Sequence, residues 1–382
     1  MTTLEEAMNR FGRIGIWLAM GVVGILAQAG PAFAGTAATA AAADMAHDGQ
    51  HDFDFELGTW KIHLKKLVHP LTGSHEWVEF DGTSVTEKVW DGKAEIEQFE
   101  TDSAVSGHIE GLTLRLYNPA SHQWSLYWAS SRTGTLAIPT VGGFKDGRGE
   151  FYDQEEIDGR VILVRFVWTG TETNSPHFEQ SFSDDGGKTW EVNWITDQTR
   201  TSDEPAITHA TPAAAHTDSA GTTALRNGQH DFDFHFGTWH THIRRLVHPL
   251  AGSTEWVELD GTVKTRKIWD GKANLEEIEA GNGATHFKGL TLFLYNPEAH
   301  QWSQNFASIS DGAMSTTPLM GEFKDGRGEL YDQEMFNGRE ILVRFVWSQI
   351  KENSHHVEQA FSADGGKTWE PNFVADLTRE SE

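Results

Sequence analysis

Histidine and acidic residues are the side chains in this sequence that could most readily bind a metal or transfer a proton. Six histidines recur about 180 residues further along the chain: His51, His63, His69, His108, His122 and His177 match His230, His242, His248, His286, His300 and His356. Together with Asp52 and Asp54, such imidazoles suit zinc and other transition metals. The sequence contains no HExxH motif and no comparably tight spacing, however. We therefore interpret the histidines as surface or turn residues and expect no metal and no cofactor.

A charged set also recurs on two successive strand-like segments of each half. Period-two alternation places Arg165 on one face with Leu163 and Val167, and places His177 on one face with Glu179. The counterparts in the second half are Arg344, His356 and Glu358. If these faces line a cavity, the arginine could hold a ligand carboxylate, and the glutamate or histidine could act as a base. The alternative, which we favour, is a solvent-facing cross-strand ion pair that contributes little to stability.

The stretch LYWASSR contains Tyr127 and Trp128, whose large rings could line a cavity or its rim. The matching positions in the second half hold Asn305 and Phe306. Two cavities lined by this stretch would not be equivalent, whereas ordinary drift in core packing is the alternative explanation. The complete set of ligand-binding candidates is Tyr127, Trp128, Arg165, His177, Glu179, Arg344, His356 and Glu358.

Several kinds of catalytic or glycan-processing site find no support in the sequence. There is no cysteine, no GxSxG motif, and the KDGRG stretches are typical of hairpin turns rather than phosphate-binding loops. The phrases FSDDGGKTW and FSADGGKTW resemble the Asp-box of sialidase propellers, but each half has one, whereas a propeller needs one roughly every 50 residues. We interpret the phrase as a tight turn in which Asp185 accepts bonds from nearby amides and Gly186 and Gly187 adopt positive φ.

The elements that must position these residues come in two copies. GQHDFDFELGTW begins at Gly49 and GQHDFDFHFGTW at Gly228, and the match continues to DQTR and DLTR. A repeat of this length indicates two whole domains, at 49–200 and 228–382. Residues 201–227 and 35–48 are rich in small residues, which predicts a flexible linker and a flexible leading segment.

Strand signals dominate each copy. Runs of β-branched and aromatic residues, such as GLTLRLY and RVILVRFVW, alternate with turn signals such as FDGT, WDGK and KDGRG. No window shows a helical stripe of apolar residues. We expect an all-β chain of two antiparallel up-and-down barrels with nine to ten strands each, and a sandwich is the alternative.

The segments FELGTW and FHFGTW resemble the Gly-x-Trp signature that opens lipocalins and other calycin barrels. Together with EWVEFDGT, GLTLRLYNP and FEQSFSDDGGKTWE, they resemble an uncharacterised lipocalin-like domain family of bacteria over nearly all of both copies. The resemblance implies a calycin-type barrel in which Trp60 and Trp239 close one end, and it carries over no catalytic residue. Haem-binding barrels of the nitrobindin type are related, but their histidine near the chain end is missing from the last strands here.

The N-terminus predicts export. Arg10 and Arg13 precede an apolar run, and Ala32-Phe33-Ala34 forms a small-residue cleavage site, so residues 1–34 have the pattern of a signal peptide. An uncleaved membrane anchor is the alternative. The mature chain would be periplasmic or secreted, with no stable membrane insertion. A net charge of −26 also argues against nucleic acid as a partner.

These observations favour an exported protein that binds a small, partly apolar ligand in aromatic-lined barrel cavities. One alternative is a small-molecule enzyme of the isomerase or hydrolase type, with Glu179 or His177 as base. Another is a tandem interaction module, because the fold alone does not decide the function. The sequence leaves the oligomeric state open.

Overall fold

The structure is a computed structural model that describes residues 48–103, 107–206 and 226–380. The expected signal peptide at 1–34 lies outside the described residues, as do most of the 35–48 segment and most of the 201–227 linker. Within the described ranges, no helix has the length and hydropathy of a membrane span.

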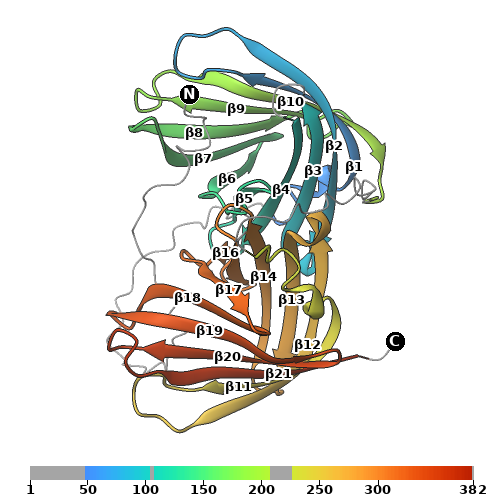
Figure 1. The fold of residues 1–382 in the computed structure, drawn as a ribbon. Helices are drawn as coiled ribbons and strands as arrows, with labels where there is room; N and C mark the ends of the chain where they lie inside the picture. Colours follow the sequence, from blue (N-terminus) through green and yellow to red (C-terminus); the bar gives the residue numbers. More distant parts are fainter. Residues whose placement is uncertain (1–47, 104–106, 207–225, 381–382) are drawn as a thin grey trace, which may run out of the picture.

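The first copy is an antiparallel barrel in which each strand pairs with the next along the chain and β1 pairs with β10 to close the ring (Figure 1). Its elements, including two short 3-10 helices, are η2 (Asp54–Glu56), β1 (Gly58–Leu67), β2 (Trp77–Val89), η3 (Trp90–Gly92), β3 (Ala94–Ser103), β4 (Gly107–Asn118), β5 (Gln123–Ser130), β6 (Thr140–Lys145), β7 (Arg148–Ile157), β8 (Arg160–Thr169), β9 (His177–Ser183) and β10 (Glu191–Ser202).

The second copy repeats this barrel, and the pairing of β14 with β15 completes its ring. Its elements are η4 (Asp233–His235), β11 (Gly237–Leu246), β12 (Trp256–Ile268), η5 (Trp269–Gly271), β13 (Ala273–Gly281), β14 (His286–Asn296), β15 (Gln301–Ser308), β16 (Ala313–Met314), β17 (Leu319–Lys324), β18 (Arg327–Phe336), β19 (Arg339–Lys351), β20 (Ser354–Ser362) and β21 (Glu370–Arg379). The ring in each described barrel contains ten strands, so the expected all-β, tandem up-and-down architecture is confirmed.

Short hairpins explain why the chain meanders. Asp146-Gly147 joins β6 to β7 and Asp158-Gly159 joins β7 to β8, and all four residues have positive φ. Two successive residues of this conformation form the turn whose twist matches antiparallel strands. The phrase FSDDGGKTW is also a turn, because Asp185 accepts bonds from the amides of Lys188 (2.9 Å) and Thr189 (3.0 Å).

Strand register defines an inner and an outer face in each barrel. Trp60 of β1 pairs with Ser84 of β2, and the same face continues around the ring through Phe99, Trp128 and Phe166. Trp60 and Trp239 are fully buried at the end where β1 and β11 begin. We call this end of each barrel the closed end and the opposite end, near the β1–β2 and β9–β10 loops or their counterparts, the mouth.

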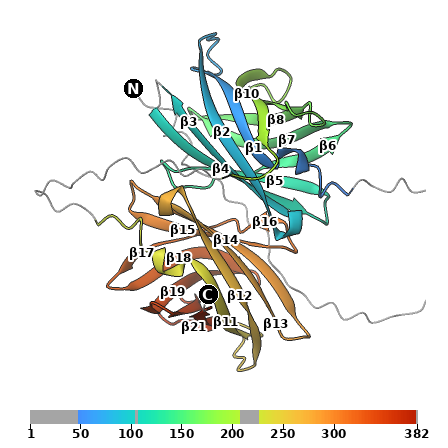
Figure 2. The same ribbon diagram turned by 90° about the vertical axis from the view of Figure 1, so that its right-hand side faces the viewer.

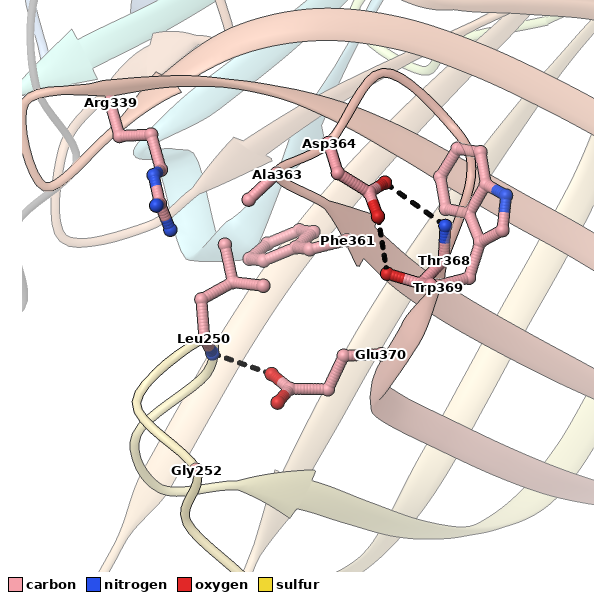
Figure 3. A pocket seen from close by; sticks show the side chains of 9 residues that line it. All are labelled: Leu250, Gly252, Arg339, Phe361, Ala363, Asp364, Thr368, Trp369 and Glu370. Atoms are coloured by element: carbon pink, nitrogen blue, oxygen red, sulfur yellow. Dashed lines mark hydrogen bonds between the residues drawn. The ribbon is translucent and has the colours of Figure 1, made fainter.

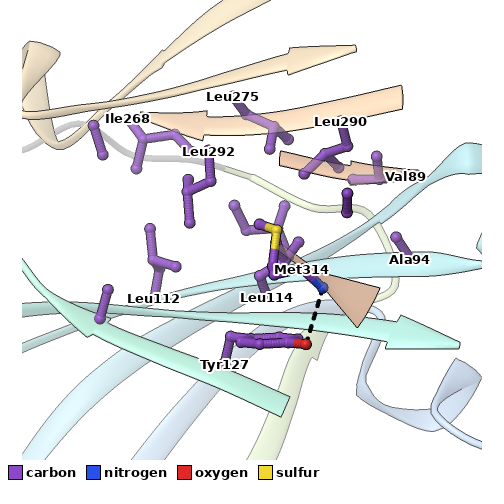
Figure 4. Close-up of a cluster of buried hydrophobic side chains, with 14 of the residues drawn as sticks. Val89, Ala94, Leu112, Leu114, Tyr127, Ile268, Leu275, Leu290, Leu292 and Met314 are labelled. Atoms are coloured by element: carbon purple, nitrogen blue, oxygen red, sulfur yellow. Dashed lines mark hydrogen bonds between the residues drawn. The ribbon is translucent and has the colours of Figure 1, made fainter. Parts of the chain in front are cut away.

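The outer faces of β3–β5 and β13–β15 pack against each other and join the two barrels. One buried cluster contains side chains from both, including Ala94, Leu112, Leu114, Tyr127, Leu275, Leu290, Leu292 and Met314 (Figure 4). Figure 2 shows β4 and β5 of the first barrel next to β14 and β15 of the second. Ion pairs also join the barrels: Arg266–Glu87 at 2.5 Å, Lys272–Glu110 at 3.3 Å and Lys288–Asp91 at 3.9 Å.

Each barrel extends one loop across the junction to contact the other barrel. Residues 131–139 follow β5, and Gly134 lies so close to the Tyr295 carbonyl of the other barrel that a Cβ would overlap it. Residues 309–318 follow β15, and Gly312 approaches the Tyr117 carbonyl in the same way. Both glycines have positive φ, 57° and 56°. The two copies therefore contact each other through equivalent segments.

Candidate functional site

The closed end of each lumen is filled by aromatic rings. In the first barrel, the fully buried Phe53 packs edge-on against Trp124 and Trp168, with ring centroids 5.3 and 5.4 Å apart. In the second barrel, Phe232 makes the same contacts with Trp302 and Trp347, at 5.0 and 5.2 Å. We call these two aromatic clusters, centred on Phe53 and Phe232, the plugs. Because each plug fills the closed end, a ligand could enter only the mouth half of the lumen.

The mouth half of the first barrel is lined by rings that face inward but are only partly buried. Phe80, Trp128, Phe166 and Trp194 all lie on the inner face by strand register, and solvent reaches each of them. Gly111 makes room for Trp128, because a Cβ there would overlap the indole ring. Inward aromatic side chains that remain reachable by solvent are typical of an open binding cavity.

Two carboxyl groups on β7 face this part of the lumen. Asp153 pairs with Val164 and Glu155 with Ile162, both buried residues of the inner face. Burial, reinforced by the charge of Glu155, raises the pKa of Asp153 to about 8, and burial also raises the pKa of Glu155. The Asp153 Oδ1 atom is shielded from solvent and has no hydrogen-bond partner within the described residues.

Uncharged polar groups adjoin the two acids. Thr140 is only 1 % exposed, and its hydroxyl also lacks a hydrogen-bond partner among the described residues. Its neighbour Val141 pairs with Tyr152, so Thr140 lies beside Asp153 on the inner face. Further round the wall, Gln180 Nε2 donates to Asn193 Oδ1 at 2.7 Å.

The second barrel repeats this arrangement with small changes. Asp332 and Glu334 replace the acids, burial raises the pKa of Asp332 to about 7, and its Oδ1 also lacks a partner in the described chain. Gln359 donates to Asn372 at 2.8 Å, as Gln180 does to Asn193. The rings here are phenylalanines (Phe306, Phe345 and Phe373), and Leu319 stands where the first barrel has Thr140.

Charged groups are buried between the plug and the β3–β4 wall of the first barrel. The Arg115 guanidinium donates to Glu97 at 2.6 Å and lies 3.8 Å from Glu95. Burial raises the pKa of Glu95 to about 8 and that of Glu56 to about 7, against the attraction of Arg115. Burial alone would lower the pKa of Arg115. The negative charges of Glu97, Glu56 and Glu95 have the larger effect, so the pKa of Arg115 is raised. Trp168 Nε1 donates to Glu56 at 3.0 Å.

At the matching positions between the plug and the wall, the second barrel has different residue types. His235 replaces Glu56 and bonds to Glu276 at 2.7 Å through Nε2 and to His355 at 3.1 Å through Nδ1. Burial, with the neighbouring His235 and Arg379, lowers the pKa of His355 to about 2. Asn274 and Phe293 take the places of Glu95 and Arg115. Within the described residues, no group of three or more potential ligands has an arrangement that could hold a metal ion.

A shallow pocket of 370 Å³ lies at the mouth of the second barrel, between the β11–β12, β18–β19 and β20–β21 connections (Figure 3). Its lining includes Leu250, Phe361 and Arg339, and Glu370 accepts a bond from the Leu250 amide at 2.5 Å. In the first barrel, Arg160 pairs with Asp184 at 3.0 Å, whereas Ala363 stands at the matching position of the second. Arg339 therefore lacks that partner.

The charged candidates Arg165, His177 and Glu179 lie on the outer face of the first barrel. Their neighbours Phe166 and Phe178 face inward, and the Arg165 guanidinium lies 4.5 Å from the centre of the Trp190 ring. His177 bonds to Asp197 at 2.6 Å and to Glu179 at 3.3 Å. Burial alone would lower the pKa of His177, but these bonds outweigh it and raise the pKa.

The counterparts in the second barrel have the same placement. Arg344 lies over the Trp369 ring at 4.7 Å and 3.7 Å from Glu358, and His356 bonds to Asp376 at 2.7 Å. In both barrels, the arginine stacks on a tryptophan and the histidine bonds to an aspartate on the outer face, which is the solvent-facing placement that strand alternation offered as the alternative to a lumenal site.

Tyr127 and Trp128 point to opposite sides of β5. Trp128 faces the lumen, where its ring lies 6.0 Å from that of Phe99. Tyr127 is buried in the junction, where its hydroxyl accepts a bond from the Met314 amide at 3.0 Å. Its expected place at a cavity is not what the structure shows, because the outer face of β5 is covered by the second barrel.

Sequence reasoning missed the lumenal acids, although a usable signal was present. In GEFYDQEE, Asp153 and Glu155 have the same alternation phase as Phe151, which is fully buried. Acids in phase with a core aromatic indicate an inward-facing carboxylate. The same holds for Asp332 and Glu334, which are in phase with Leu330.

Comparisons with known proteins add little to this picture. No family model and no curated protein matches the sequence. Among solved structures, an S-type phycobiliprotein lyase (CPES) from Guillardia theta is similar over 40% of this chain and 91% of its own, with 11% identity and a TM-score of 0.28. A DUF3598-family protein of unknown function from Nostoc punctiforme covers 87% of this chain and 100% of its own, with 11% identity and a TM-score of 0.27.

Transferrin binding protein B from Haemophilus parasuis is a third similar structure. It matches over 85% of this chain and 76% of its own, with 8% identity and a TM-score of 0.18. Similarity at these levels carries no information on ligand or activity.

Proposed function

We propose that the protein binds a small, partly apolar molecule in the mouth half of each barrel lumen, one molecule per barrel. The observation that carries this proposal is the partly exposed inner wall, where Trp128, Phe166 and Trp194 share the inner face with Asp153, whose Oδ1 has no hydrogen-bond partner among the described residues. Concave apolar surface with a few convergent polar groups is the usual composition of a small-molecule site. An aromatic wall supplies affinity, and the carboxyl groups orient the ligand.

The closed ends support the assignment of the barrels as lipocalin-like. Trp60, of the Gly-x-Trp segment, donates through Nε1 to the Glu56 carbonyl at 2.6 Å, and the Arg200 guanidinium lies 4.0 Å from its ring centre. Trp239 and Arg379 repeat the stacking at 4.1 Å. Each barrel thus has one sealed and one open end, the arrangement expected of a cup for a small ligand.

Calorimetric titration of the mature chain with naphthylmethanol, a small neutral aromatic alcohol, tests the proposal. We expect about two molecules bound per chain, with quenching of tryptophan fluorescence. Trp128→Phe and Trp194→Phe copy the second barrel, so they should reduce the quenching while leaving binding largely intact. Trp190→Phe is the matched control, because Trp190 stacks under Arg165 on the outer face.

Two outcomes would contradict the proposal. The first is the absence of saturable binding. The second is quenching that Trp190→Phe reduces while the two lumenal substitutions do not, since the probe would then lie on the outer surface.

We also propose that the chain is exported and cleaved after Ala34. The support is the pattern of basic residues, apolar run and small-residue site at 1–34. Intact-mass measurement of the protein from its native cell fractions should give a periplasmic or secreted chain that begins at Gly35. A full-length, membrane-associated chain would contradict the proposal.

A further inference from the structure

We infer that the ligand of each lumen is a small organic cation, an ammonium group on an apolar body, which the carboxylates of Asp153 and Asp332 bind. The inference rests on the proposed function and names its ligand class. Its basis is a pair of identically placed lumenal acids without a cationic partner, set in a wall of aromatic rings.

The acids of the first barrel have no compensating charge nearby. Among the described residues, neither Asp153 nor Glu155 has an ion-pair partner, and Glu155 is the charged group that acts on Asp153. A buried carboxylate is costly unless a positive group pairs with it. Asp332 and Glu334 repeat the situation in the second barrel, where Glu334 acts on Asp332.

The basic side chains that face the first lumen are engaged elsewhere. Arg115 bonds to Glu97 at 2.6 Å, and Arg200 donates to the backbone carbonyls of Phe55 and Leu57 at the closed end. Lys66 lies at the mouth with its ammonium 5.7 Å from the centre of the Trp194 ring. This contact shows that a ring of the lumen wall accommodates an ammonium group.

A second observation points to the same position. Thr140, 1 % exposed and facing the lumen beside Asp153, leaves its hydroxyl oxygen without a hydrogen-bond partner in the described chain. Buried polar atoms are seldom left unpaired. A hydroxyl and a carboxylate oxygen that adjoin are acceptors for two N–H groups, and an ammonium ion carries three.

The aromatic rings of the lumen wall add a further attraction for a cation. A cation over an aromatic face gains electrostatic energy, and the gain is larger for tryptophan than for phenylalanine. The first barrel presents Trp128 and Trp194 where the second has Phe306 and Phe373. The hydroxyl of Thr140 is likewise replaced by Leu319. We therefore expect the first barrel to hold the cation more tightly than the second.

The test compares three probes that share one aromatic body: naphthylmethylammonium, naphthylmethanol and naphthylacetate. Each is titrated into the mature chain by calorimetry at pH 7.5 and about 0.15 M salt, where screening weakens long-range attraction to the net charge. The pKa of Asp153 is about 8 in the free protein, and an ammonium group bound beside it lowers that pKa, so the carboxyl group ionises as the cation binds. We expect the ammonium to bind at least about tenfold more tightly than the alcohol, and the acetate to bind most weakly.

Variants then locate the preference. The Asp153→Asn and Asp332→Asn double variant should bind ammonium and alcohol alike, and the Asp153→Asn single variant should remove the tighter of the two ammonium sites. Glu156→Gln is the matched control, because this acid lies on the exposed face of the same strand. It removes one negative charge outside the lumen and should keep the preference. Asparagine keeps the shape of the side chain, and near-ultraviolet circular dichroism checks that each variant retains native packing.

The outcomes separate the ligand class from the proposed function. Equal binding of alcohol and ammonium, or tightest binding of acetate, would leave lumenal binding in place and overturn the cation inference. A preference that survives in the double variant, or that Glu156→Gln also removes, would overturn it as well. If no probe binds, the proposed function fails and the inference fails with it.

Discussion

Residues at matching positions of the two barrels carry different charge. Glu56, Glu95 and Arg115 are buried in the first barrel, where the second has His235, Asn274 and Phe293. Desolvation favours the neutral form of a buried acid or imidazole, so it raises the pKa of Glu95 and lowers that of His355. The pH dependence of stability should therefore have opposite signs for these two groups.

Glu95→Gln should stabilise the protein at alkaline pH. The pKa of Glu95 is about 8 in the folded chain against an ordinary value of 4.5, so its favourable contribution is complete below pH 4.5 and is lost as pH rises towards 8. The uncharged glutamine removes this loss. We expect a gain on the order of 3 kcal/mol at pH 8 relative to pH 5, measured by urea unfolding at both pH values.

Glu156→Gln serves as the control for this experiment, since Glu156 is exposed. It should shift stability equally at the two pH values. If Glu95→Gln behaves like this control, Glu95 is charged in the folded protein near neutral pH and its burial is not what sets its protonation.

His355→Phe should reduce sensitivity to mild acid. The pKa of His355 is about 2 in the folded chain against 6.5 ordinarily, so its contribution is present above pH 6.5 and is lost as pH falls below that value. Phenylalanine suits the surrounding rings of Phe234, Trp239 and Trp347 and takes up no proton. The substitution removes the partner of His235, so the variant should be less stable at pH 7 but lose fewer degrees of Tm between pH 7 and pH 5.

Differential scanning calorimetry measures both losses, and His248→Phe, at an exposed histidine, is the control. An equal loss of Tm in the wild type and in His355→Phe would show that His355 takes up its proton without unfolding.

Among the elements, sequence reasoning located most strands and hairpins because their signals are local. Asp146-Gly147, in the KDGRG stretch, forms a turn as predicted, since asparagine, aspartate and glycine tolerate positive φ best. The expected turn at FDGT was wrong, because residues 80–83 lie inside β2, which pairs with both β1 and β3. Sequence reasoning could not assign the face of β4. In GLTLRLYN, alternation suggests leucines inside and Arg115 outside, but Leu112 and Leu114 pack against the other barrel while Arg115 faces the lumen. Amphipathic alternation shows that two faces differ, not which of them is covered by a neighbouring domain.

The lumenal acids were missed for a related physical reason. Polar residues on a strand are normally assigned to solvent, so the polarity of Asp153 outweighed the alternation phase that it shares with Phe151. The charged network of Arg165, His177 and Glu179 drew attention because its members have complementary chemistry. The structure places these three residues on the outer face, where His177 bonds to Asp197 and Glu179 and Arg165 stacks on Trp190.

The two crossing loops give a prediction about these elements. Gly312→Ala and Gly134→Ala should each destabilise the protein more than Gly159→Ala. All three glycines have positive φ and incur the same backbone penalty, about 1 kcal/mol. Only at Gly312 and Gly134 would the added Cβ also overlap a carbonyl of the other barrel, while nothing lies within 4 Å at Gly159.

The overlap should add about 1–3 kcal/mol, the usual cost of overpacking, which thermal unfolding of the three variants would reveal. Equal losses for all three would mean that the loops move away from the junction at little cost, and the reciprocal crossing would then contribute little to the contact between barrels.

At the scale of the whole molecule, the two repeated barrels pack side by side, and each covers part of the outer wall of the other. The junction is apolar at its centre, with Leu114 and Leu292 fully buried, and is flanked by the ion pairs Arg266–Glu87 and Lys272–Glu110. The junction covers the side walls β3–β5 and β13–β15, and it includes the crossing loops 131–139 and 309–318, which leave β5 and β15 at the mouth ends of the two barrels. Under the proposed function, a ligand would enter each lumen through the rest of the mouth, between the β1–β2, β7–β8 and β9–β10 connections or their counterparts.

Leu114→Asp combined with Leu292→Asp should separate the barrels without unfolding them. Each aspartate would bury an unpaired charge in the junction, which costs several kcal/mol, whereas separation exposes the charge to water at the expense of the buried apolar contact. Small-angle scattering should then show a larger radius of gyration with native far-ultraviolet circular dichroism. Val161→Asp, on a 61 % exposed outer position of β8, should change neither quantity. The substitutions lie on the outer faces of β4 and β14, so under the proposed function ligand binding by the double variant should persist. If binding is lost along with the contact, the crossing loops couple the junction to the lumens.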